Sequence, residues 1–319
     1  MTFQAFSSGD LLADRRADYA TALADERQLE AAIDLMGQAL ALAPHWAAGW
    51  FRMAEWQEAT GDCTAASTSW QRVLELDPVD HLGASLRLDL ARRVPVSESM
   101  PAAFVETLFD QYAARFDAAL TGHLDYRGPD QILQALFAAG RTRFERVMDL
   151  GCGTGLMGQA IRPHAGWLGG YDISAQMLAQ AQAKGLYDAL SKCDLSRLEL
   201  DPQRYDLVLA ADVFIYIGAL EQIVAWAAAS LTPGGVLAFT LEELHTGTAE
   251  LRLMPSRRYA HRESYFTRLL AQAGFGTVQI HRAVLRLDAG QPVHGLTAFA
   301  VLVPQPFRRE TDGEEMASA

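Results

Sequence analysis

The stretch VMDLGCGTGLMG, residues 147–158, is the part of the sequence that decides the fold. An apolar segment typical of a strand runs into a glycine-rich loop, and a segment typical of a helix follows. Two glycine patterns overlap in the loop. Read from Gly151 the spacing is G-x-G-x-G, whereas read from Gly153 it is G-x-G-x-x-G, the spacing of a dinucleotide-binding turn. The two patterns predict different ligands.

Charge and position choose between the two patterns. Asp149 stands at the end of the strand, two residues before Gly151, and is expected beside whatever ligand the loop holds. A carboxylate there repels a pyrophosphate but can organise a cationic ligand such as S-adenosylmethionine (AdoMet), which carries an ammonium and a sulfonium and no phosphate. Gly151 also follows the strand immediately, whereas the dinucleotide pattern would start two residues late. The loop is therefore predicted to bind AdoMet.

Strand-like and helix-like segments alternate around this loop. The candidate strands are 146–151, 167–172, 187–194, 205–212 and 235–243, and the candidate helices between them are 155–162, 175–184 and 220–229. Strands that alternate with helices indicate βαβ units and a parallel sheet. After a helix at 262–273, the segments 277–287 and 294–304 are two strands with no helix between them. An antiparallel pair is therefore expected at the edge of the sheet.

The N-terminal part of the chain has a helical repeat pattern. The segment AAIDLMGQALALAP (31–44) aligns with AASTSWQRVLELDP (65–78), and their final prolines are about 34 residues apart, the length of a tetratricopeptide repeat (TPR). The segment resembles two TPR units over residues 11–78, with a third helix at 81–92. Two units bury too little apolar surface to stand alone. The array is therefore expected to pack on the second domain or to self-associate, and a role in binding a protein partner stays open.

Composition limits the classes of function. The chain has 319 residues, half of them hydrophobic, and a formal net charge of −12. Nucleic acid is not an expected partner, because binding to phosphates relies on Lys and Arg. Cys63, Cys152 and Cys193 form no disulfide or zinc pattern, so no metal centre is expected. No signal peptide or membrane-spanning run is visible, so a cytoplasmic protein without a membrane partner is expected.

The segment boundaries follow from the same patterns. Pro95 and Pro101 interrupt the helices, and the polar end of the chain is typical of disorder. The expected limits are 1–94 for the TPR-like domain, 95–128 for a linker and a lid helix, 129–307 for the α/β domain and 308–319 for a disordered tail.

Taken in order, the elements of residues 105–304 resemble the class I AdoMet-dependent methyltransferases. VMDLGCGTG has the form of the first motif of that family, and GGYDIS, KCDLSRL, YDLVLAADVFIYIG and LTPGGVLAFTLEE follow in the family's order. The resemblance implies a Rossmann-like α/β domain, mostly parallel with an antiparallel C-terminal edge pair, preceded here by an all-α TPR-like domain. It implies AdoMet as the cofactor and S-adenosylhomocysteine as its product. The combination resembles the TPR-containing methyltransferases of bacteria.

The resemblance also implies which residues hold the cofactor. Asp172 would accept the two ribose hydroxyls, and Asp194 would contact the adenine amino group. Tyr112 and Phe116, in LFDQYAARFD (108–117), would close over the methionine end, although both also suit an ordinary buried helix face. The remaining expected contacts are Asp149, Gly151, Gly153, Gly155, Ile173, Met177, Leu195, Ala211, Asp212 and Val213.

The acceptor is less well determined. ADVFIY stands where amino-directed nucleic-acid and protein glutamine methyltransferases carry N/D-P-P-Y/F, which argues against those substrates. We expect in-line displacement at the sulfonium, which needs mainly alignment, with a small molecule as acceptor. The candidate bases are His245, His261 and Tyr216, although His261 could instead cap the following helix. Arg252, Arg257 and Arg258 could hold an acidic acceptor. Protein methylation aided by the repeats, and a non-catalytic AdoMet-binding module, are the alternatives.

Overall fold

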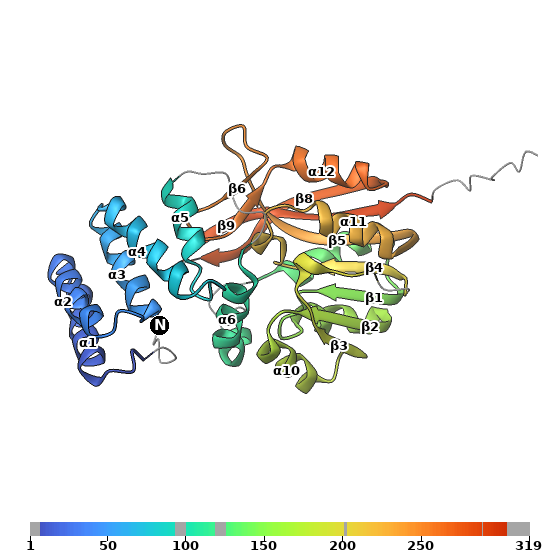
Figure 1. Cartoon of the computed structure of the whole chain (residues 1–319). Coiled ribbons are helices and arrows are strands. Elements are labelled where there is room, and N and C mark those ends of the chain that lie inside the picture. Colours follow the sequence, from blue (N-terminus) through green and yellow to red (C-terminus); the bar gives the residue numbers. More distant parts are fainter. Residues whose placement is uncertain (1–6, 93–99, 119–125, 201–202, 289, 305–319) are drawn as a thin grey trace, which may run out of the picture.

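The structure is a computed structural model that describes residues 7–92, 100–118, 126–200, 203–288 and 290–304. An N-terminal layer of helices is followed by an α/β domain around one large sheet (Figure 1). The expected tail at 308–319 and most of the expected linker lie outside the described residues. No helix within the described ranges combines the length and the apolar character that crossing a bilayer requires.

The N-terminal layer consists of helices that pack in antiparallel pairs. They are α1 (Leu11–Asp25), α2 (Leu29–Leu42), α3 (Ala47–Ala59), α4 (Cys63–Leu76) and α5 (Ala84–Arg92). Small residues let α1 and α2 approach closely, since Ala13 and Ala17 lie buried in one cluster with Met36. In the second pair, Trp70 is buried edge-on against Phe51, with ring centroids 4.7 Å apart. The all-helical layer is confirmed, and its assignment to the TPR family stays a prediction.

The α/β domain is built on a sheet whose described strands number nine. The central strands are β1 (Phe144–Leu150), β2 (Ala165–Asp172), β3 (Ala189–Lys192), β4 (Tyr205–Ala210) and β5 (Leu231–Glu243), in the spatial order β3-β2-β1-β4-β5. They are parallel to one another. The strand order reverses between β1 and β4, and ligands of open α/β folds bind at the carboxyl ends of the strands at such a point.

Beyond β5 the sheet continues as two separate strand pairs. The hairpin β6 (Leu251–Leu253) and β7 (Tyr259–His261) pairs with the carboxyl end of β5, through Glu242 and Glu243. The long strands β8 (Phe275–Asp288) and β9 (Gln291–Leu302) are antiparallel, and β9 pairs along most of β5. The predicted antiparallel edge pair is confirmed. The hairpin was not predicted, because strands of three residues are too short to show a period.

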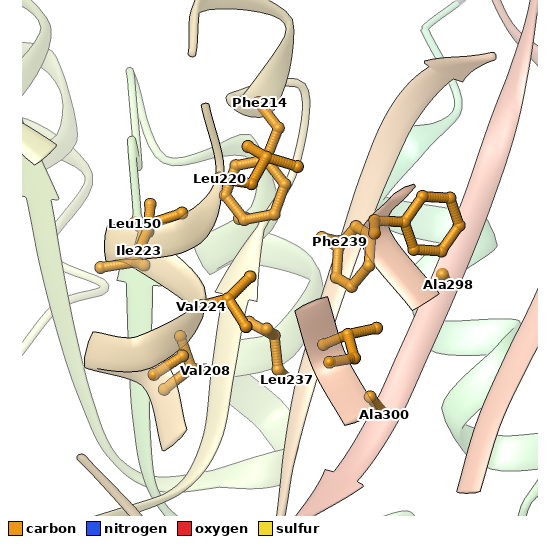
Figure 2. Close-up of a cluster of buried hydrophobic side chains, with 14 of the residues drawn as sticks. Leu150, Val208, Phe214, Leu220, Ile223, Val224, Leu237, Phe239, Ala298 and Ala300 are labelled. Carbon is orange, nitrogen blue, oxygen red and sulfur yellow. The ribbon is translucent and has the colours of Figure 1, made fainter. Parts of the chain in front are cut away.

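Helices cover both faces of the sheet. On one face lie α11 (Glu221–Ser230) and α12 (Glu263–Gln272), and Figure 2 shows Val224 of α11 close to Val208 of β4 and Leu237 of β5. On the other face lie α8 (Gly128–Ala138) and α9 (Leu156–Ile161). The remaining helix, α10 (Ala175–Lys184), has the limits that were predicted, with Ser174 capping its first turn.

The lid helix predicted within residues 95–128 is broken into short pieces. It forms α6 (Ala102–Tyr112), the 3-10 turn η1 (Ala113–Arg115) and the short α7 (Phe116–Ala118), and its last expected residues lie outside the described chain. We call α6 to α7 the roof segment.

One apolar cluster joins the two parts of the molecule. Leu86 of α5, Phe104 of α6, and Leu253 and Tyr259 of the β6–β7 hairpin are buried together. In Figure 1, α5 and α6 lie between the outer helices and the sheet. The helical layer therefore packs on the second domain through its last helix, α5, and self-association, the predicted alternative, stays a prediction.

Candidate active site

A cavity of about 500 Å³ lies at the carboxyl ends of the central strands, where the strand order reverses. The glycine loop after β1 and the ends of β2 and β4 contribute to its walls, together with the roof segment and the turn between β6 and β7. Most of the predicted cofactor residues line it: Tyr112, Phe116, Gly151, Gly153, Asp172, Ile173, Met177, Asp194, Leu195, Ala211, Asp212 and Val213.

The glycine loop needs glycine for two different reasons. Gly151, Gly153 and Gly155 all have left-handed backbones, with φ of 64°, 54° and 91°. A Cβ on Gly151 would stand 2.5 Å from a methyl of Val213, so packing forbids a side chain there. A Cβ on Gly153 would meet nothing closer than the ring of Phe116, at 3.8 Å. The backbone at Gly153 is therefore open for a ligand to approach.

Asp149 does not line the cavity, which corrects the prediction that its carboxylate stands beside the ligand. Its side chain is on the face of β1 shared with Val147, and it is only 1% exposed. One carboxylate oxygen accepts from the Tyr187 hydroxyl at 2.7 Å, and the other has no hydrogen-bond partner within the described chain. Burial raises the pKa of Asp149 to about 7. Asp149 is therefore a support beneath the loop.

Gly155 lies under the loop as well. Its prospective Cβ would be 3.1 Å from the ring of Tyr187, the same side chain that bonds Asp149, and Gly155 does not line the cavity. The ring of Tyr187 also occupies the space above Gly158 and Gly170. The pattern of glycines thus makes room for one tyrosine between the loop, α9 and β2.

Asp172 ties the end of β2 to the glycine loop. One oxygen accepts from the backbone N–H of Gly153 and the other from that of Ser174, both at 2.8 Å. A carboxylate offers about four acceptor positions, so Asp172 keeps capacity to accept from a ligand hydroxyl. Burial raises the pKa of Asp172, and hydrogen bonds from the backbone N–H groups of Ser174, Gly153 and Ile173 oppose that rise. The group is therefore fixed in place at the wall of the cavity.

Asp194 occupies the corresponding position after β3. It caps the short turn η4 (Leu195–Arg197) by accepting from the backbone N–H of Ser196 at 2.9 Å and from its hydroxyl at 2.7 Å. Among the described residues that line this end of the cavity, from Phe116 through Gly153 and Asp172 to Ser196, there is no Lys or Arg. Arg197 lies 3.9 Å from Asp194 but does not line the cavity. The wall therefore presents two carboxylates, which fit a ribose and an adenine and do not fit a pyrophosphate, so the residues present suit AdoMet.

The roof segment is tied to the cofactor half by side-chain carboxylates. Asp110 accepts from the Ser174 hydroxyl at 2.5 Å, and Asp117 accepts from Lys184 at 2.6 Å and from the hydroxyl of Thr154. Phe116 packs edge-on against Phe109, with ring centroids 6.0 Å apart. Tyr112 lines the cavity while 37% exposed, so it is not an ordinary buried aromatic.

The opposite end of the cavity holds a buried ionic cluster. Arg286 of β8 is 1% exposed and donates to Asp212 at 2.6 Å and to Glu242 of β5. Asp212 itself has a left-handed backbone, with φ of 60°, and its N–H donates to the hydroxyl of Thr240. Tyr126 and Tyr216 also line this end, and burial raises the pKa of both.

Sequence reasoning missed Arg286 and Tyr126. A register shift in β8 between Val284 and Arg286 buries Leu285 and Arg286 in succession, where an unbroken strand would expose one of them. The sequence signal that could have pointed to Arg286 is its place between two leucines in LRLD, residues 285–288.

Neither predicted histidine reaches the cavity, which corrects that prediction. The side chain of His245 is 60% exposed and lies 3.7 Å from Glu243. His261 is buried and donates from Nε2 to the carbonyl of Gly218 at 2.8 Å, so it neither caps α12 nor faces a substrate. Burial lowers the pKa of His261 to about 4. Tyr216 is the predicted candidate that does line the cavity, together with Arg257 and Arg258, whereas Arg252 does not.

Comparison with known proteins agrees with this geometry. Residues 148–237 match the model of a protein family described as a methyltransferase domain. Malonyl-[acyl-carrier protein] O-methyltransferase of Enterobacter lignolyticus (strain SCF1) is 34% identical over 117 residues, which is 37% of this chain and 45% of that protein. Ubiquinone biosynthesis O-methyltransferase of Coxiella burnetii (strain Dugway 5J108-111) is 28% identical over 100 residues, 30% of this chain and 43% of that protein. The chain thus spans less than half the length of either relative.

A solved structure gives the same fold. N-methyltransferase NodS from Bradyrhizobium japonicum WM9, in complex with S-adenosyl-L-homocysteine, superposes with a TM-score of 0.50 at 17% identity, over 62% of this chain and 98% of that one. Residues 148–237 therefore match a methyltransferase domain, and the α/β part of the chain has the fold of an S-adenosylmethionine-dependent methyltransferase.

Proposed function

We propose that the protein transfers a methyl group from AdoMet to an oxygen atom of a small-molecule acceptor. The observation that carries the proposal is the division of one cavity into two unlike ends. Asp172 and Asp194 lie at the end beside the glycine loop, and Tyr216, Arg258 and Arg286 lie at the other. A cavity of about 500 Å³ is within the usual range for sites that enclose small ligands.

The chain's own residues have separate tasks in this reaction. AdoMet, when bound, supplies a methyl group that is already activated on a sulfonium. Asp172 and Asp194 would fix the nucleoside part, and the open backbone at Gly153 would let it approach. The roof segment, held by Asp110 and Asp117, excludes water and keeps the partners aligned. Alignment is the main requirement of an in-line displacement, which fits a cavity whose described lining residues include no histidine.

The choice of oxygen rests on two supports. Two of the relatives, one 34% and one 28% identical over the matched residues, are named O-methyltransferases. In addition, the sequence that follows β4 here forms the 3-10 turn η5 (Phe214–Tyr216), which carries a tyrosine hydroxyl to the cavity and has no N/D-P-P-Y/F element. A phenol beside the acceptor end can hold a hydroxyl or carboxylate in place by hydrogen bonding.

The helical layer is proposed to be TPR-like and to have a structural role. Its last helix, α5, buries Leu86 against the roof segment and the β6–β7 hairpin, both of which contribute to the cavity. Recruitment of a protein substrate by this layer is the alternative, and the two are separated by the assay that follows.

Label transfer from methyl-labelled AdoMet tests the proposal. Purified protein is incubated with a cell extract, and the products are separated by mass. Label is expected in the low-mass fraction. Release of the label as methanol on alkaline hydrolysis would identify a methyl ester, and label retained in an O–CH3 group would identify a methyl ether; either result identifies an oxygen acceptor. Label that appears only in protein, or on nitrogen or sulfur, would contradict the proposal.

A further inference from the structure

The acceptor end of the cavity carries an unusual charge for this protein. Arg257, Arg258 and Arg286 line it, and Asp212 and Glu242 pair with Arg286. The formal balance of these groups is one positive charge, in a chain whose formal net charge is −12. A cavity wall of this sign attracts an anion and disfavours an amine.

Arg286 has unused hydrogen-bonding capacity although it is buried. Both of its terminal nitrogens bind carboxylates, whereas its Nε–H has no acceptor within the described part of the chain. A buried N–H without an acceptor costs free energy, so such a group is expected to meet a polar partner that the protein itself does not supply. Because Arg286 lines the cavity, a bound acceptor molecule is the natural source of that partner.

The turn that carries Arg258 is held firmly at the mouth of the same end. The backbone of Met254 and Arg258 closes it with an N–H···O bond of 2.8 Å, and Arg257 adopts a left-handed φ of 58°. A left-handed arginine is a strained residue, and strain of this kind persists only where surrounding packing imposes it. That packing is the cluster of Leu253, Tyr259 and Phe104 on either side of the turn.

We infer that the acceptor molecule carries a carboxylate, and that Arg258 and Arg286 hold this carboxylate at the end of the cavity away from Asp172 and Asp194. The inference rests on the proposed function and narrows its substrate class. The planar guanidinium group of Arg258 matches the geometry of a carboxylate, and the Nε–H of Arg286 can donate one further hydrogen bond to it. The formal net charge of the groups at this end is one positive charge, which a monoanion neutralises better than a phosphate dianion does. Of the two common anionic groups, carboxylate and phosphate, the carboxylate is therefore the better match.

Binding of matched acid and amide pairs tests the inference directly. The probes are hexanoate with hexanamide, benzoate with benzamide, and succinate with succinamide, each titrated into protein saturated with S-adenosylhomocysteine. Phenyl phosphate and benzylamine complete the set. We expect at least one acid to bind about tenfold to a hundredfold more tightly than its amide, the range of a hydrogen bond to a charged group.

Variants assign the effect to the arginine. Arg258→Gln is expected to remove the preference for the acid, while Arg258→Lys keeps part of it. Arg252→Gln, on the same hairpin but outside the cavity, is the matched control and should retain the full preference. Tighter binding of the amides, of benzylamine or of phenyl phosphate would overturn the inference, as would failure of every acid to bind or an unchanged preference in Arg258→Gln. If the unmodified protein does not bind S-adenosylhomocysteine, that result would instead count against the proposed function.

Discussion

Replacing Asp172 by alanine gives the sharpest test of the cofactor site. In the structure this carboxylate joins Gly153 to Ser174 by accepting hydrogen bonds of 2.8 Å from both backbone N–H groups. Each hydrogen bond from a ribose hydroxyl to an ionised carboxylate is worth about 1.5–3 kcal/mol. Water replaces part of that in the variant, so the expected loss is about 2–4 kcal/mol, or roughly 30- to 1,000-fold in affinity for AdoMet and S-adenosylhomocysteine.

The same substitution also removes two bonds that order the loop, so binding must be separated from folding. Asp206 offers a matched control, because it too accepts from two backbone N–H groups, those of Glu145 and Arg146, at 2.7 and 2.8 Å. Asp206 is at the start of β4, away from the carboxyl ends of the strands. Asp206→Ala should therefore lower the free energy of unfolding without weakening the binding of AdoMet or S-adenosylhomocysteine.

Titration calorimetry on both variants, with thermal unfolding of each, is the assay. A dissociation constant that is unchanged in a folded Asp172→Ala protein would refute the ribose role. Equal weakening in Asp172→Ala and Asp206→Ala would show that general loosening of the sheet, and not a contact with the ligand, sets the affinity. NAD is expected to give no heat with the unmodified protein, because none of the described residues that line the cavity beside Asp172 and Asp194 is a Lys or an Arg.

The remaining predictions address the support beneath the loop, the roof and the helical layer. The pKa of Asp149 is raised to about 7 in the folded protein. Between about pH 4 and 7 the folded state therefore keeps a proton on this group, whereas the unfolded state has lost it, and the free energy of unfolding should fall as pH rises through that window. Asp149→Asn should remove this fall and raise the free energy of unfolding at pH 8 by roughly 2–4 kcal/mol; parallel pH profiles of both proteins would contradict it. Asp117→Asn should speed dissociation of S-adenosylhomocysteine about tenfold in stopped-flow experiments, since it releases the roof from Lys184 and Thr154, and an unchanged rate would mean that the roof is held elsewhere. Deletion of residues 1–95 should lower solubility and melting temperature because it uncovers Leu253 and Tyr259, and a truncated protein that is equally soluble and stable would argue against the structural role.

The parts of the fold that could be predicted are those with a strong local pattern. The glycine loop requires left-handed backbones that other residues adopt at a cost, so its position and the strand before it were visible in the sequence. The strands β1, β2, β4 and β5 are long apolar runs, and α10 has both a capping serine and a C-terminal glycine, which explains the agreement of its limits. The hairpin of β6 and β7 owes its form to pairing with β5, a contact far along the chain that no local pattern records.

The errors at the site have a common physical cause. Asp149 was placed beside the ligand because of its charge, but successive residues of a strand point to opposite faces, and its face is the one that Tyr187 covers. His245 and His261 were chosen because imidazoles titrate near neutral pH, a property that burial against the Gly218 carbonyl removes from His261. In each case residue type was known and burial was not. Arg286 was missed for the converse reason, since a bulge in β8 turns inward a side chain that a regular strand would expose.

The structure assigns the two ends of the cavity to different parts of the chain. The cofactor end is built from the loop and strand ends of the central sheet, within residues that match the methyltransferase family. The proposed acceptor end combines Asp212 and Tyr216, which lie inside 148–237, with groups outside that range: Arg286 from β8, Arg258 from the hairpin, and the cluster through which α5 supports that hairpin. A domain shared with relatives can therefore bind the same cofactor, while the surrounding segments decide the acceptor. Substitutions in the N-terminal helices should for that reason change the affinity for the acceptor more than the affinity for the cofactor. A larger change in cofactor affinity would argue against a contribution of the helical layer to the acceptor end.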